Sequence, residues 1–220
     1  MAGEQAFTDD ESTSERAFDY DRTVALSDGV FAIALTLLVL NVTLPSLAPG
    51  HTSALGSKLL QRHQQYTSYG ISFAVIALLW ARHHRLFRGL SRIDATVTAL
   101  NLAYLAFVAF LPFPTRVLGL YGGEPAAVVL YATTVAVVTI LGGLTRIHVQ
   151  RAGLASPSGA RALAEREHWA LAPAVFIASI AIAFVDTTVA KLFWLLLLAP
   201  RFRASGGALP FRRAPRDGRS

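Results

Sequence analysis

The first long apolar segment of the chain, residues 22–41, reads RTVALSDGVFAIALTLLVLN. After Arg22 its only charged residue is Asp28. With its flanking residues it forms an apolar block from Val24 to Leu44, which Pro45 closes. About 20 apolar residues in a row match the thickness of the hydrocarbon core of a bilayer. The segment therefore predicts a helix that spans a membrane.

Five further apolar blocks follow along the 220 residues. They predict an all-α polytopic membrane protein, with six transmembrane helices in residues 21–200. The composition agrees, because only 15% of the residues are charged, against roughly 25% in a soluble domain. The last two blocks flank a short link around Asp186, and form either a tight helical hairpin or one broken span. The five blocks run from about Tyr66 to Ala81, Ala95 to Phe113, Ala126 to Ile147, Trp169 to Val185 and Val189 to Pro200.

The two ends of the chain differ from the apolar blocks. Residues 1–20 are acidic and polar and lack the pattern of a signal peptide, so we expect a disordered N-terminal tail. Residues 201–220 are rich in arginine, and we expect a basic cytoplasmic tail that lies against anionic lipid. Basic residues do not alternate with aromatic ones on any soluble segment, so no nucleic-acid partner is expected. The chain has no cysteine, which excludes disulfides and thiolate metal sites.

The basic residues predict an orientation. Most of the 20 lysines and arginines lie between the second and third blocks, between the fourth and fifth, and after the sixth. Cytoplasmic loops carry an excess of lysine and arginine. The alternation therefore places both termini in the cytoplasm and favours an even number of spans.

An aliphatic stripe runs along the first predicted helix. At about 100° per residue, Ile33, Leu37 and Leu40 fall on one face. Gly29 and Thr36 flank this stripe. By periodicity alone, the stripe can be ordinary lipid-facing or packing surface.

Asp28 lies roughly opposite the stripe. An acidic residue in an apolar helix is costly and is a candidate for function. The alternative is a structural carboxylate whose hydrogen bonds are satisfied near the membrane interface. If the stripe faces a central axis, Asp28 faces the other helices of its own chain.

The second block ends in WARHHRLF, residues 80–87, where Trp80 shares a helix face with His83 and His84. Adjacent histidines point in different directions on a helix. A hydrogen-bonding role toward Asp28, or a role as an interfacial anchor, is therefore favoured over a metal or haem site. Asn101 in the third block is expected to bond across helices. Hydrolase and nucleotide-binding signatures are missing from the sequence, so no enzyme, catalytic residue, metal site or cofactor is expected.

Three motifs occur together: RTVALSDGVFAI from Arg22, WARHHRLF from Trp80, and Asn101 followed by LPFP at residues 111–114. In this order and spacing they resemble bacterial members of the transmembrane-protein-175 family, potassium channels related to the endolysosomal potassium channel of animals. The resemblance covers about residues 20–200. The family has phenylalanine before its Ser-Asp pair where this chain has Leu26, so the packing of that corner is expected to differ.

The resemblance implies four six-helix subunits around one pore that the first helix lines. Ile33, Leu37 and Leu40 would form the constriction, and a layer of Thr36 would contribute to selectivity. A structural polar network would fix the first helix, with the choice between the two histidines open. Its members would be Arg22, Ser27, Asp28, Trp80 and His83 or His84.

The resemblance thus implies a modestly selective, leak-like potassium channel in the plasma membrane of a bacterium. Its partners would be further copies of the chain in a homotetramer, the lipid bilayer and the permeating potassium ion, with no other cofactor. The alternative is a secondary or proton-coupled transporter that uses Asp28 and the histidines of the second block. Such a transporter predicts saturable, pH-coupled flux.

Overall fold

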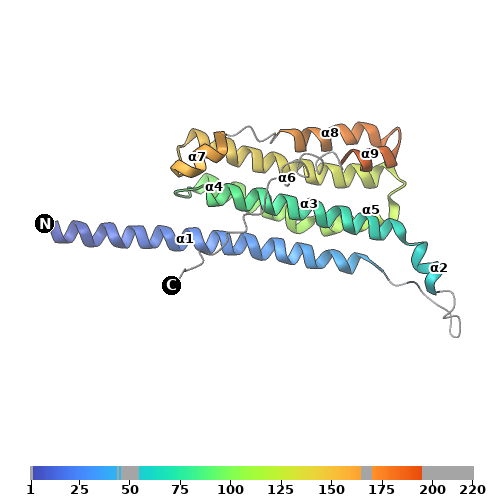
Figure 1. The fold of residues 1–220 in the computed structure, drawn as a ribbon, viewed down its shortest axis with the longest axis horizontal. Coiled ribbons are helices and arrows are strands. Elements are labelled where there is room, and N and C mark those ends of the chain that lie inside the picture. The colour runs from blue at the N-terminus through green and yellow to red at the C-terminus, as the bar shows by residue number, and fades with distance from the viewer. Residues whose placement is uncertain (1, 44, 46–54, 165–169, 195–220) are drawn as a thin grey trace, which may run out of the picture.

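The computed structural model describes residues 2–43, 45, 55–164 and 170–194, and this part of the chain is helical (Figure 1). The prediction of an all-α protein is confirmed. An isolated bridge pairs Leu90 with Ala155 near one end of the bundle. The elements in chain order are α1 (Ala2–Leu37), η1 (Leu38–Asn41), α2 (Leu55–Leu60), α3 (His63–Arg88), α4 (Ala95–Phe110), α5 (Pro112–Tyr121), α6 (Pro125–Arg151), α7 (Pro157–Ala164), α8 (Leu171–Ala183) and α9 (Thr187–Phe193).

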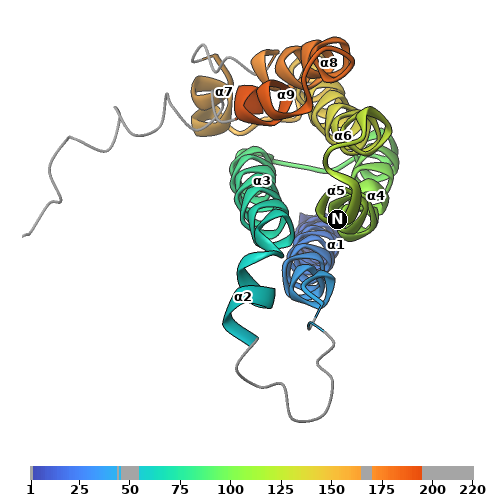
Figure 2. The ribbon, with the colours of Figure 1, turned by 90° about the vertical axis from the view of Figure 1, so that its right-hand side faces the viewer.

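The long helices lie side by side along the longest axis of the molecule, as Figure 1 and the end view in Figure 2 show. Helix α6 packs against α8 on one side and α4 on the other, and α4 packs against α1. Helix α3 contacts both α1 and α5. Helix α1 therefore lies at the edge of the bundle, held by α3 and α4.

Helix α1 is longer than the apolar block that predicts it. It begins at Ala2 and so includes the acidic segment, for which the sequence predicts disorder. Its N-terminal part projects beyond the other helices (Figure 1).

Three helical stretches are long and apolar enough to cross a membrane: Tyr20–Asn41, Ala95–Tyr121 and Pro125–Arg151. They correspond to the first, third and fourth apolar blocks. The third is longer than predicted, because the PFP motif does not end it. Proline fits the first turn of a helix, and α5 begins at Pro112 and continues the apolar stretch.

The fifth and sixth blocks form two short helices that pack against each other, α8 and α9. Asp186 caps the N-terminus of α9, because its carboxylate accepts hydrogen bonds from the amides of Thr188 and Val189. Among the described residues, the hairpin alternative therefore holds rather than one broken span. Trp169, residues 195–200 and the C-terminal tail at 201–220 lie outside the described part of the chain.

The core is apolar and lies where α1, α3, α4, α6 and α8 meet. Its largest fully buried side chains include Phe31, Ile76, Tyr131 and Phe176. A smaller cluster around Phe87 closes the end of the bundle at which α3 ends and α4 begins. The core thus extends across the bundle from α1, through α4 and α6, to α8.

Candidate pore helix and its polar network

One face of α1 is buried in the bundle. Ser27, Phe31, Ala34 and Leu38 are each 1% exposed or less. Their spacing of three or four residues is that of a single helix face. This face packs on α3 and α4 and fixes the rotation of α1 about its own axis.

The aliphatic stripe lies on a different face of α1 and is exposed. Ile33, Leu37 and Leu40 are 59%, 41% and 69% exposed. Gly29 and Thr36 are exposed beside them. The Thr36 hydroxyl donates to the carbonyl oxygen of Ile33 at 2.9 Å. Its proton therefore points back along the helix, and its oxygen remains able to accept.

Asp28 turns from the stripe toward α3. The indole Nε1 of Trp80 donates to Asp28 Oδ1 at 2.8 Å. The Trp80 ring stacks on His84, with 5.3 Å between the ring centroids. Trp80 is 40% exposed, so this contact lies at the rim of the bundle. Asp28 does face another helix of its own chain, as the helical wheel predicts.

A second, buried part of the network centres on Asn101 of α4. Its amide Nδ2 donates to Ser27 Oγ at 3.2 Å, and its Oδ1 lies 2.8 Å from His83 Nε2. The Ser27 hydroxyl in turn donates to the carbonyl oxygen of Thr23 at 2.8 Å. Asn101 thus bonds across helices, as predicted, and joins α1, α3 and α4.

The two histidines occupy different surroundings. His83 is buried, stacks on Phe87 at 4.2 Å between centroids, and lies against Phe31 and Tyr104. His84 is only partly buried, against Trp80. The structure therefore divides the predicted network into a buried group, in which Asn101 joins Ser27 and His83, and a rim group of Asp28, Trp80 and His84. Arg22 lies nearer the N-terminus, on the exposed side of α1.

Satisfied polar groups hold α1 in position. Leaving a buried donor or acceptor without its partner costs about 1–3 kcal/mol. Asn101 satisfies one group on α1 and one on α3 at once. Such a network fixes the register of the three helices more tightly than apolar packing alone.

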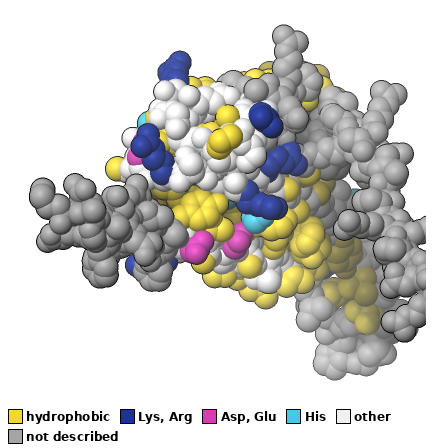
Figure 3. All heavy atoms as spheres, turned by 60° about the vertical axis from the view of Figure 1, so that its left-hand side comes forward, with side chains coloured by type: hydrophobic (Ala, Val, Ile, Leu, Met, Phe, Trp, Pro, Cys, Tyr) yellow, Lys and Arg dark blue, Asp and Glu magenta, His cyan; other side chains and the backbone are white. Residues whose placement is uncertain are grey.

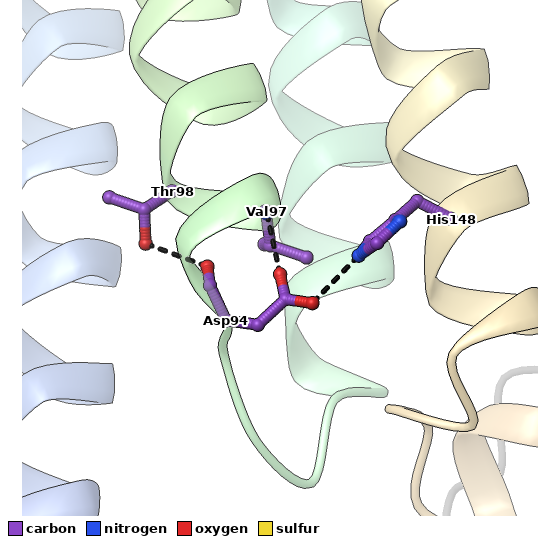
Figure 4. A network of polar contacts seen from close by, with 4 residues as sticks. All are labelled: Asp94, Val97, Thr98 and His148. Atoms are coloured by element: carbon purple, nitrogen blue, oxygen red, sulfur yellow. Dashed lines mark hydrogen bonds and ion pairs between the residues drawn. The ribbon is translucent and has the colours of Figure 1, made fainter.

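A polar contact that the sequence did not reveal joins α4 to α6 (Figure 4). Asp94 Oδ1 accepts from the amide of Val97 at 2.7 Å and caps α4. Its Oδ2 lies 2.7 Å from His148 Nε2 on α6. The hydrogen bond from Val97, and then that from His148, hold the pKa of the Asp94 carboxyl below its ordinary value. Within the described residues, no group of three histidines or acids could hold a metal ion.

Known proteins resemble this chain in sequence and in fold. Residues 22–112 match the family model described as "Endosomal/lysosomal potassium channel TMEM175". A potassium channel of Streptomyces collinus is 41% identical over 107 residues, which are 48% of this chain and 50% of that protein. A potassium channel of Chamaesiphon minutus is 42% identical over 106 residues, which are 48% of this chain and 52% of that protein. Residues 22–112 of this chain are therefore similar to the TMEM175 family.

The likeness to a solved TMEM175 structure extends beyond the matched segment. The crystal structure of a lysosomal potassium-selective channel TMEM175 homolog from Chamaesiphon minutus superposes with a TM-score of 0.74 at 28% identity, covering 86% of this chain and 99% of that one. The match to the curated bacterial relatives spans about half of their length. The mouse relative, described as an endosomal/lysosomal proton channel, is 35% identical over 111 residues, 48% of this chain but 22% of that protein. These TMEM175 relatives are ion channels, not enzymes.

Proposed function

We propose that this chain is the subunit of a homotetrameric, modestly selective, leak-like potassium channel in which α1 of each copy lines one central pore. The observation that carries the proposal is the exposed aliphatic stripe on α1. One chain presents one stripe, so a pore requires several copies around an axis. The match of residues 22–112 to the family model and the names of the bacterial relatives support potassium as the permeating ion.

In this proposal Ile33, Leu37 and Leu40 form rings that narrow the pore. Rings of aliphatic side chains make an apolar constriction that can close by losing its water. Selectivity then arises from the cost of removing water from the ion. Potassium sheds water more easily than sodium, and the Thr36 oxygen is positioned to accept a cation because its proton is engaged with Ile33.

The proposal also includes six spans for each subunit, with both termini on the cytoplasmic side of a bacterial plasma membrane. Helix α3, which corresponds to the second apolar block, is less apolar than the three candidate spans. Its polar side chains find partners inside the bundle: Ser72 accepts from Thr115 at 2.9 Å, and Gln65 accepts from the amide of Thr43 at 3.1 Å. Internal partners of this kind let a polar helix cross a bilayer.

The test is cation flux into proteoliposomes that contain the purified full chain, with a potassium gradient opposed to sodium. We expect electrogenic flux that follows the potassium gradient, does not saturate and needs no partner ion. Saturating flux that carries protons along with another ion would instead support the transporter alternative. Empty liposomes and liposomes with heat-denatured protein serve as controls.

Proton conduction is the second candidate function, because the animal relatives are described as proton channels. The same liposomes distinguish proton conduction from potassium conduction. If the chain conducts protons, a pH gradient without a potassium gradient drives a current, and the reversal potential of that current follows the proton gradient. A reversal potential that follows potassium alone supports the first candidate.

A further inference from the structure

A cavity of about 90 Å³ lies between α3, α4, α6 and α7, apart from the exposed stripe of α1. Its lining includes three arginines, Arg82 and Arg85 on α3 and Arg146 on α6, and none of the described lining residues is acidic. The cavity lies toward the end of the bundle where α3 ends and α4 begins. Figure 3 looks toward this end and shows lysine and arginine side chains on it, with acidic side chains nearby.

The arginines belong to the walls of the cavity. Arg146 donates from its guanidinium to the carbonyl oxygen of Leu163 on α7, which holds it beside the cavity. Guanidinium groups bind phosphate oxygens in pairs and with fixed geometry. Three arginines in the lining of one cavity therefore favour a phosphate over a simple halide ion.

Glycines leave space for the cavity and allow α7 to lie close to the end of α3. Gly142 and Gly143 of α6 face it without side chains. Helix α7 lies directly on the end of α3, because a Cβ added to Gly159 would lie 2.0 Å from the carbonyl oxygen of Gly89. A site for one water needs about 10–15 Å³. The cavity thus has room for a phosphate group but not for a whole lipid, whose chains must lie outside.

The cavity touches the network that fixes α1. His83 and Asn101 both line it, and Asn101 donates to Ser27 of α1. A ligand in the cavity therefore lies one hydrogen bond away from the polar contact that positions the exposed stripe.

We propose that this basic cavity binds the phosphate of an anionic phospholipid headgroup, and that the bound phosphate acts on α1 through Asn101. Basic cavities between membrane helices on the cytoplasmic side suit such headgroups. The position at the arginine-rich end of the bundle favours lipid over a soluble phosphate ester. The binding step is independent of the proposed channel function, whereas the effect on α1 rests on it.

Binding is tested by the melting temperature of the purified full chain in mixed micelles. Phosphatidylglycerol is compared with phosphatidylcholine at equal mole fraction, and sodium phosphate with sodium chloride at equal ionic strength. We expect phosphatidylglycerol to raise Tm by about 2–4 °C. The Arg82→Gln/Arg85→Gln variant should lose this rise. The matched variant Arg88→Gln/Arg92→Gln removes the same charge from neighbouring positions outside the cavity and should keep it.

The outcomes separate the possible ligands. A rise with inorganic phosphate as well as with lipid supports the cavity and assigns it to phosphate from either source. Equal rises in both double variants, or no rise in the unaltered chain, would overturn the proposal. If the Arg82→Gln/Arg85→Gln variant does not fold, Arg85→Gln alone supplies the test, because Arg85 is exposed.

The effect on α1 is tested by flux into vesicles with and without phosphatidylglycerol. We expect a change of about fivefold in the unaltered chain and none in Arg82→Gln/Arg85→Gln. Flux that is independent of the lipid, beside a positive Tm result, removes the coupling but leaves the binding site. The absence of flux in every lipid counts against the channel function, and the Tm result still decides the cavity.

Discussion

The candidate spans Tyr20–Asn41, in α1 and η1, and Pro125–Arg151, which is α6, are equally apolar but pack differently. Their most apolar windows have the same mean hydropathy of 2.1, but 22% of the α1 window is buried within the chain and 50% of the α6 window. Helix α6 lies in the middle of the bundle and packs against α4 and α8. Helix α1 buries one face and leaves the face of Ile33, Leu37 and Leu40 exposed. Hydropathy therefore identifies a candidate span. Only the packing of the helices shows whether that span is surrounded by its own chain or keeps an exposed face.

The largest expected effect comes from the exposed stripe. Ile33→Asn should raise potassium flux by about tenfold and relax selectivity, because a polar ring keeps the constriction wet and lowers the barrier by about 1.4 kcal/mol. Flux into proteoliposomes with potassium or sodium gradients measures both. Ile177→Asn on α8, also an exposed isoleucine, is the control and should leave flux unchanged. Unchanged flux in Ile33→Asn would remove this residue from the constriction.

The buried network gives the next effect. Asn101→Leu leaves Ser27 and His83 without their partner and should lower the free energy of unfolding by about 2–4 kcal/mol, seen as a lower Tm of the solubilised oligomer. The control is Thr145→Val on α6, whose hydroxyl donates to its own helix at Leu141. That change should cost less than about 1 kcal/mol. Equal losses would show that α1 needs no special anchor.

The rim contact should matter less. Trp80→Phe keeps an aromatic ring beside His84 but removes the hydrogen bond to Asp28. Because the contact is partly exposed, we expect a loss of about 0.5–1.5 kcal/mol in stability. Urea or thermal unfolding of the two proteins measures this difference. A loss larger than that of Asn101→Leu would reverse the order of the two groups.

The smallest effect concerns the contact between α4 and α6. The pKa of Asp94 is lower in the folded chain than its ordinary value of 3.8, so its contribution to stability is present above pH 3.8 and is lost as the pH falls through the folded pKa. Asp94→Asn should therefore flatten the loss of Tm on acidification below about pH 4. The variant His148→Gln should do so only in part, because the amide of Val97 still bonds the carboxylate. Identical acid profiles in all three proteins would contradict this account.

The sequence predicted that Asp28 and the aliphatic stripe lie on different faces of α1, because a 100° period needs no knowledge of the neighbouring helices. It placed Asp28 toward the other helices and Asn101 across a helix interface, and both placements hold. It could not decide between His83 and His84. Adjacent residues on a helix differ by 100°, and which of them meets α4 depends on how the helices pack.

Other features depend on distant parts of the chain. Asp94 precedes α4 in the manner of a capping residue, but nothing near it points to His148, 54 residues away. The third apolar block ends at Phe113 in the sequence, within a PFP motif, because proline breaks a helix interior. In the structure, however, a new helix begins at Pro112 and continues the apolar stretch. The cavity beside Arg82 and Arg146 also joins separate helices, so sequence order hides it.

The chain has no cysteine of its own, which permits a direct test of the claim that α1 lines the pore. Single cysteines are placed at Ile33, at Leu40 and, as the matched control, at Ile177 on α8, and a charged thiol reagent is added during potassium flux. The account predicts that the reagent reduces flux through Ile33→Cys and Leu40→Cys and leaves Ile177→Cys unaffected. Flux that resists the reagent at Ile33 and Leu40, or that falls equally at Ile177, would contradict it.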